Sequence, residues 1–68
     1  MTFGEKVQEA RGQLLLTQTQ LAAELGVSFS TVNRWEKGLH EPQFLERRKF
    51  EDFCKRRGVK FEDKGGQA

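Results

Sequence analysis

Between Leu21 and Gly38, the sequence LAAELGVSFSTVNRWEKG concentrates hydroxyl, amide and guanidinium side chains in one short segment. At helical spacing, Val32 and Trp35 share one side of this segment, and the polar side chains lie on the other. The polar residues predicted to face outward are Ser28, Ser30, Thr31, Asn33 and Arg34. Small side chains at the start of a helix let its backbone approach a surface, and longer donors one turn later reach base edges or phosphates. This pattern therefore favours hydrogen bonding to a nucleic acid.

No group of residues in the sequence has the composition of a catalytic or metal centre. His40 and Cys54 are the single histidine and the single cysteine, so they supply neither a zinc ligand set nor an internal disulfide. No paired acid and base and no activated nucleophile accompany them. Cys54 lies on an apolar stripe, where it is either a buried inert thiol or a redox sensor. The sequence predicts a protein that is not an enzyme and binds no cofactor.

Composition and charge indicate one small domain that acts through its surface. The chain has 68 residues, of which 35% are hydrophobic and 32% charged, and this size allows a single core. The formal net charge is +2, and the excess of Lys and Arg falls between residues 43 and 57. The basic runs 47–49 and 55–57 are either solvated helix faces, since acidic residues alternate with them, or phosphate clamps.

Start and stop signals divide the sequence into four predicted helices. Thr2 with Glu5, and Thr17 with Gln20, have the spacing of a capping box, and Ser28 is a typical N-cap residue. Glycines suited to the left-handed position after a helix follow the second, third and fourth helices. The predicted helices are Phe3–Leu14, a two-turn helix between Thr17 and Gly26, Phe29–Lys37 and Phe44–Arg57. The sequence therefore predicts an all-α fold.

Residues 59–68 differ in character from the helical part. The tripeptide Val59-Lys60-Phe61 alternates like a short strand, and Gly65-Gly66 is typical of a turn or linker. Val59 and Phe61 either rest on the last helix or pair with a second subunit. The predicted division is a helical domain at residues 1–58, followed by a short extended segment and a flexible tail at residues 59–68.

Two short helices joined through a glycine, the second with a small polar N-terminus, form the pattern of a helix-turn-helix unit. The sequence resembles the phage repressor and Cro-like helix-turn-helix domains in TQTQLAAELGVSFSTVNRWEKG, in Pro42 and in the upstream ARGQL. The resemblance implies a compact four-helix DNA-binding domain with the helix-turn-helix at its second and third helices. The fifth helix that usually builds the dimer interface is missing, because GVKFEDKGGQA is short and polar. We therefore expect a truncated five-helix domain that pairs weakly, or pairs only on DNA.

The same resemblance implies roles for individual residues. Gln18 matches a glutamine that touches a phosphate and braces the recognition helix. Arg11 and Glu36 match an ion pair between the first helix and the end of the third. The positions that usually face bases are held by Phe29, Ser30 and Arg34. The positions of further phosphate contacts are held by Lys37 and Gln43.

Two aromatic residues of the third predicted helix each have two interpretations. Trp35 could stack on a nucleic-acid base, as tryptophan often does, but its spacing from Val32 and the family pattern favour a place in the core. Phe29 either folds back on the core as a hydrophobic staple or presses on a thymine methyl group. The residues predicted to contact DNA are Thr17, Gln18, Ser28, Phe29, Ser30, Asn33, Arg34, Lys37 and Gln43.

These features predict sequence-specific binding of double-stranded DNA through a recognition helix in the major groove. The expected protein is a small transcriptional regulator of bacterial or phage type. Two alternatives keep the same fold: an N-terminal targeting module of a larger DNA-acting enzyme, and a protein-interaction adaptor. A single unpaired thiol and the absence of apolar runs of membrane-spanning or signal-peptide length predict a cytoplasmic protein without a membrane partner, associated with the nucleoid when bound.

Overall fold

The computed structural model describes residues 1–61, which form four α-helices and no strand. The helices are α1 (Phe3–Leu14), α2 (Gln18–Leu25), α3 (Phe29–Lys37) and α4 (Phe44–Arg57). Their bounds confirm the predicted helices, and the fold class is all-α as predicted. No helix within residues 1–61 combines the length and the apolar character that crossing a membrane requires.

Side chains predicted to cap the helices do so in the structure. Thr2 Oγ1 accepts the backbone N–H of Glu5 at 3.1 Å, and Glu5 Oε1 accepts the N–H of Thr2 at 2.9 Å. Thr17 and Gln20 form the same reciprocal pair at the start of α2, with distances of 3.0 and 2.9 Å. Because these bonds satisfy N–H groups that have no acceptor within the helix, the starts of both helices are locally specified.

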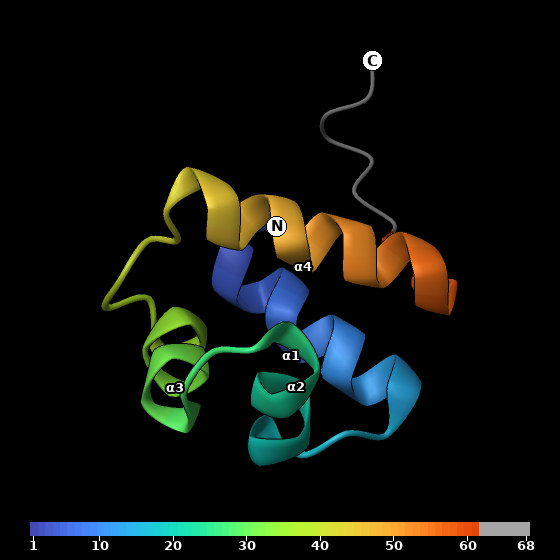
Figure 1. Cartoon of the computed structure of the whole chain (residues 1–68), viewed down its shortest axis with the longest axis horizontal. Helices are drawn as coiled ribbons and strands as arrows, with labels where there is room; N and C mark the ends of the chain where they lie inside the picture. The colour runs from blue at the N-terminus through green and yellow to red at the C-terminus, as the bar shows by residue number, and fades with distance from the viewer. Residues whose placement is uncertain (62–68) are drawn as a thin grey trace.

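The four helices pack around one core. Figure 1 shows α4 across the top of the molecule, α2 and α3 at the bottom, and α1 running between the two levels. α3 packs against both α1 and α2, and α2 also packs against α4. The third helix is thus held from two sides, and its remaining face is open to solvent.

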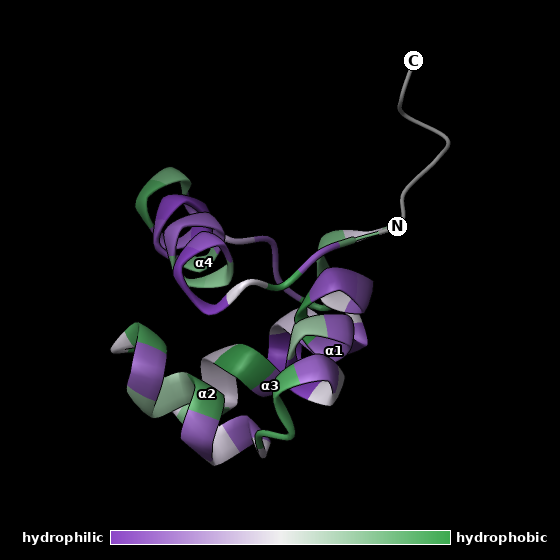
Figure 2. Cartoon of the chain, turned by 90° about the vertical axis from the view of Figure 1, so that its right-hand side faces the viewer, coloured by the Kyte–Doolittle hydropathy of each residue, from purple (hydrophilic) through white to green (hydrophobic). Residues whose placement is uncertain are grey.

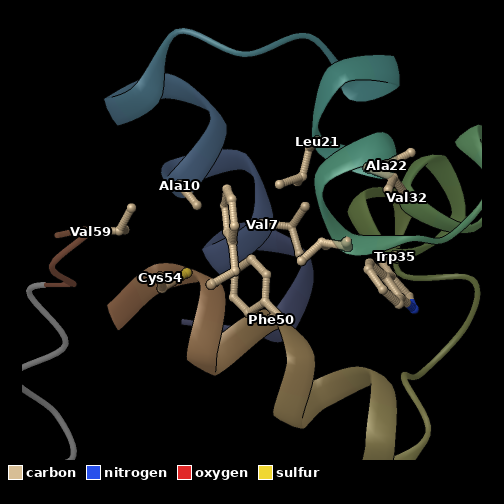
Figure 3. Close-up of a cluster of buried hydrophobic side chains, with 11 residues drawn as sticks. Val7, Ala10, Leu21, Ala22, Val32, Trp35, Phe50, Cys54 and Val59 are labelled. Carbon is tan, nitrogen blue, oxygen red and sulfur yellow. The ribbon is translucent and has the colours of Figure 1, made fainter. Parts of the chain in front are cut away.

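The core is apolar and draws on every helix (Figure 3). Its largest fully buried side chains are Trp35, Phe50, Phe53, Leu21, Val7 and Val32. Phe3 joins the helices at one end of the core, since its ring meets the rings of Trp35 and Phe50 edge-on, each at a centroid distance of 5.2 Å. Trp35 is 1% exposed, which confirms its interpretation as a core residue.

Cys54 belongs to this core and is 4% exposed. Burial is the largest cause that raises the pKa of its thiol from 9.0 to about 11, and the nearby carboxylate of Glu51 acts in the same direction. The thiolate is the reactive form of cysteine, so a raised pKa and low exposure both suppress its reactivity. Of the two interpretations of Cys54, the structure supports the buried inert thiol.

At Gly4, the α1 backbone lies against the end of α3. A Cβ atom at this position would lie 2.3 Å from the carbonyl oxygen of Trp35 and 3.2 Å from that of Glu36. No side chain fits at such a distance from backbone atoms, so the crossing requires glycine. Gly12, two turns later in the same helix, has no atom within 4 Å of the corresponding Cβ position.

The segment after α4 packs on the domain. Val59 is part of the buried cluster, and the ring of Phe61 lies 6.4 Å from that of Phe50 in α4. The Gln13 side chain of α1 bonds both backbone groups of Lys60, at 3.2 Å to the N–H and 2.7 Å to the carbonyl oxygen. Of the two interpretations of this segment, the structure has the one in which Val59 and Phe61 rest on the domain. The predicted flexible tail falls largely on residues 62–68, which lie outside the described residues.

Candidate nucleic-acid interface

The turn between α2 and α3 fixes the direction in which α3 leaves α2. Gly26 has φ of 72° and ends α2, and the N–H of Val27 donates to the carbonyl of Ala22 at 3.0 Å. This is the Schellman arrangement, in which a left-handed glycine closes the helix. Ser28 then opens α3, because its Oγ accepts the N–H of Thr31 at 3.1 Å. Two short helices are therefore joined at a defined angle by three residues.

One face of α3 is buried and the other is exposed. Val32 and Trp35 are in the core, and the exposed residues of the segment are Ser28, Phe29, Ser30, Arg34 and Lys37. Phe29 is 50% exposed and is not part of the hydrophobic cluster, so it does not act as a staple on the core. An outward aromatic ring therefore stands at the N-terminus of α3, and two cations stand near its C-terminus.

A partly buried ion pair holds α3 to α1. Arg11 Nε and Nη2 donate to the two carboxylate oxygens of Glu36 at 2.6 and 3.0 Å, and Arg11 Nη1 donates to the carbonyl of Leu16 at 3.2 Å. The Glu36 side chain is 5% exposed and that of Arg11 is 26% exposed. The hydrogen bond to Glu36 is the largest cause that raises the pKa of Arg11 above its ordinary value. The ion pair implied by the family resemblance is thus present.

Gln18 extends this network to α2. Its Nε2 donates to Glu36 Oε1 at 2.9 Å, and its Oε1 accepts Nδ2 of Asn33 at 3.2 Å. A single carboxylate therefore connects α1, α2 and α3, and Gln18 braces the third helix as the resemblance implied. Asn33 was predicted to face outward, and the structure adds a partner within the domain for its side chain. Asn33 is half-buried, and its amide is bonded to Gln18.

The remaining predicted contact residues lie at helix starts. Thr17 and Gln43 are exposed and precede the first residues of α2 and α4. The backbone N–H of Gln43 donates to Glu46 Oε1 at 2.9 Å. Both positions place exposed side chains beside the positive end of a helix, where anions are favoured.

Charge on the exposed face of α3 is not neutralised within the domain. Neither Arg34 nor Lys37 forms an ion pair within residues 1–61, whereas the acidic residue between them, Glu36, is already bonded to Arg11. Some of the cations of α4 have contacts within the domain. Arg57 lies 3.8 Å from Glu24, and Arg48 lies over the ring of Phe44. Arg47 lies 4.0 Å from Glu41, whereas Lys49, Lys55 and Arg56 form no ion pair within residues 1–61.

Comparison with protein families shows that residues 7–55 match a helix-turn-helix model. The matched part contains α2, α3 and the turn between them, together with most of α1 and α4. The chain belongs to the Cro/C1-type helix-turn-helix family. Comparisons with curated proteins and with solved structures found no match. Membership of the family makes the chain a DNA-binding domain of the regulator type.

Sequence reasoning missed two features of this helix-turn-helix domain. It did not predict the amide bond from Asn33 to Gln18, because helical spacing alone places Asn33 on the outer side of α3. It also did not predict that the α1–α2 connection takes part in the surface around the start of α2. Leu15 and Leu16 lie there beside Thr17 and Phe29, in one shallow hollow. The three consecutive leucines at positions 14–16 were the available signal.

Proposed function

We propose that this protein binds double-stranded DNA sequence-specifically, with α3 as the recognition helix in the major groove, and that it acts as a small transcriptional regulator. The observation that carries the proposal is the contrast between the two faces of α3. Trp35 and Glu36 fix its inner side to the core and to the ion pair, while Arg34 and Lys37 on the outer side have no partner within residues 1–61. A rigid helix with unpaired donors matches the requirements of base readout.

Different residues of α3 would contact different parts of the DNA. The planar guanidinium of Arg34 fits the two acceptors that guanine presents in the major groove. Ser30 is short and lies one turn earlier, where the helix must enter the groove closely. The half-exposed ring of Phe29 suits apolar contact with a thymine methyl group, which the sequence left as one of two interpretations.

Phosphate contacts would hold the helix in register. Lys37 extends from the last turn of α3, and Gln43 lies beyond the following loop. Thr17 and Gln18 stand at the N-terminus of α2, whose first N–H groups have no acceptor within the helix. Ser28 and Asn33 would act mainly by support in this proposal, since Ser28 caps α3 and Asn33 bonds to Gln18. Such contacts supply affinity without sequence preference.

Binding is proposed to involve two copies that come together on the DNA. A single recognition helix covers few base pairs, so useful affinity usually requires two half-sites. We propose that the free protein pairs only weakly, and that it works in the cytoplasm while associated with the nucleoid.

The two outer cations of α3 provide a test, because the loss of a base contact and the loss of a phosphate contact change DNA binding in different ways. We expect Arg34→Ala to lose about 1 to 3 kcal/mol of binding free energy on a preferred duplex and much less on a scrambled one. Lys37→Ala is expected to weaken both duplexes alike and to lower the slope of log Kd against log salt by about one. Equilibrium binding of both variants to both duplexes at two salt concentrations measures these effects.

Lys55→Ala serves as the control. It removes one positive charge, as Lys37→Ala does, but Lys55 lies on α4 away from the proposed surface. Its salt slope should stay at the parent value. Equal losses for Arg34→Ala on the preferred and scrambled duplexes would make Arg34 a backbone contact and contradict its assignment as the reading residue.

A further inference from the structure

Leu15 has a backbone conformation that leucine rarely adopts. Its φ and ψ are 57° and 45°, and it is the one non-glycine residue with positive φ within residues 1–61. The other three helices end on glycines at the same position, with φ between 72° and 75°. Left-handed backbone brings Cβ of an L-residue close to the following carbonyl, so leucine is strained where glycine is not. α1 is therefore the exception among the four helices.

Packing within the domain does not account for this leucine. Leu15 is 88% exposed and lies outside the hydrophobic cluster, whereas its neighbours Leu14 and Leu16 pack against that cluster. A large apolar side chain is thus held in a strained backbone and presented to solvent. Strain of this kind is often found at functional sites, where the surrounding structure maintains it.

The surroundings of Leu15 indicate what it would meet. It lines a shallow hollow together with Phe29 at the start of α3 and with Thr17 and Gln18 at the start of α2. The connection between α1 and α2 that forms its rim is hydrophobic (Figure 2). The hollow is therefore continuous with the surface proposed to contact DNA, and it combines two exposed apolar side chains with the N-terminus of a helix.

We propose that Leu15 packs on the deoxyribose of the DNA strand whose phosphate binds at the N-terminus of α2. The inference rests on the proposed function. The sugar is the apolar part of the nucleic-acid backbone, and it lies next to each phosphate. A polar contact at Thr17 and Gln18 would therefore bring apolar atoms against Leu15. Because sugars are the same at every base pair, this contact adds affinity without sequence preference or salt dependence.

Two substitutions of Leu15 separate its backbone strain from its contact. Leu15→Gly relieves the strain and removes the side chain, so Tm should rise by about 4 to 8 °C while DNA affinity falls by about three- to tenfold. Leu15→Ala keeps a Cβ in left-handed backbone, so Tm should stay near the parent value while affinity falls by a similar factor. Thermal unfolding and equilibrium binding to a preferred and a scrambled duplex at two salt concentrations measure both effects.

The loss should be equal on the two duplexes, and the salt slope should not change, since no charge is removed. Leu45→Ala is the control, because Leu45 is also exposed, at 68%, but lies on α4 outside the hollow. It should leave affinity unchanged. Parent-like affinity for Leu15→Gly, or an equal loss for Leu45→Ala, would overturn the inference while leaving the proposed function intact. A parent protein that binds no duplex at all would contradict both.

Discussion

Replacing Glu36 with glutamine is expected to destabilise the protein by about 2 to 3 kcal/mol, because Glu36 is the acceptor on which three helices converge. Removing one member of a buried ion pair costs about 3 to 5 kcal/mol, and an exposed pair contributes about 0 to 1 kcal/mol. Glu36 is 5% exposed and Arg11 is 26% exposed, so the expected value lies between these ranges. For a domain of this size, it corresponds to a fall in Tm of at least about 8 °C. Thermal unfolding measures it directly.

Glu24→Gln is the matched control for this substitution. Glu24 also faces an arginine, Arg57 at 3.8 Å, but the side chains of that pair are 47% and 41% exposed. Its removal should change the free energy of unfolding by less than about 0.5 kcal/mol. An unchanged Tm for Glu36→Gln would show that the Arg11–Glu36 pair does not hold α3 in place.

Replacing Gly4 with alanine is expected to destabilise the protein by about 2 to 4 kcal/mol. The added Cβ would lie 2.3 Å from the carbonyl oxygen of Trp35, and this neighbour is backbone that is fixed within α3. α1 would have to move away from α3, which would also disturb the contact between Phe3 and Trp35. Overpacking in a core commonly costs about 1 to 3 kcal/mol, and we expect a clash with backbone to cost somewhat more than a typical case, about 2 to 4 kcal/mol. Chemical denaturation reports the change as a lower midpoint.

Gly12→Ala tests whether this effect comes from the crossing or from the residue type. Gly12 lies in the same helix with open space around its Cβ position. Alanine is favoured over glycine in a helix interior by about 0.5 to 1 kcal/mol, so Gly12→Ala should stabilise the protein. Opposite signs for the two substitutions are the expected result. Stabilisation by Gly4→Ala would mean that α1 and α3 do not approach as closely as described.

Sequence alone specified the helices well because their ends carry local signals. The reciprocal bonds of Thr2 with Glu5 and of Thr17 with Gln20 involve residues three apart, so their spacing is visible in the chain. The ion pair of Arg11 and Glu36 was also found in advance, but through the family resemblance, because its members are far apart in sequence.

Features that depend on the meeting of distant segments were not predictable in the same way. Gly4 and Gly12 are both glycines inside α1, and only the position of α3 makes one of them essential. Asn33 has the spacing of an outer residue, but its amide reaches Gln18 because α2 packs beside α3. Leu15 gave no signal of its left-handed backbone, since leucine disfavours it. The first two properties are set by tertiary packing, and the third runs against the local preference of leucine.

In the proposed function, stability and recognition would be linked through one set of contacts. Glu36 receives hydrogen bonds from Arg11 and Gln18, and it lies between the two outer cations of α3 in the sequence. Fixing the inner side of the helix would limit the positions that Arg34 can take in the major groove. A displaced α3 in Glu36→Gln is therefore expected to weaken DNA binding as well as folding.

Selection of bound duplexes from a random DNA pool tests the central claim most directly. If α3 reads base edges in the major groove, successive rounds should enrich one short sequence, and Arg34→Ala should relax the preference at one of its base pairs. If two copies meet on the DNA, the sequence should recur as two half-sites about 10 base pairs apart. A pool that remains random while the protein stays bound would show backbone binding alone and would contradict sequence-specific recognition.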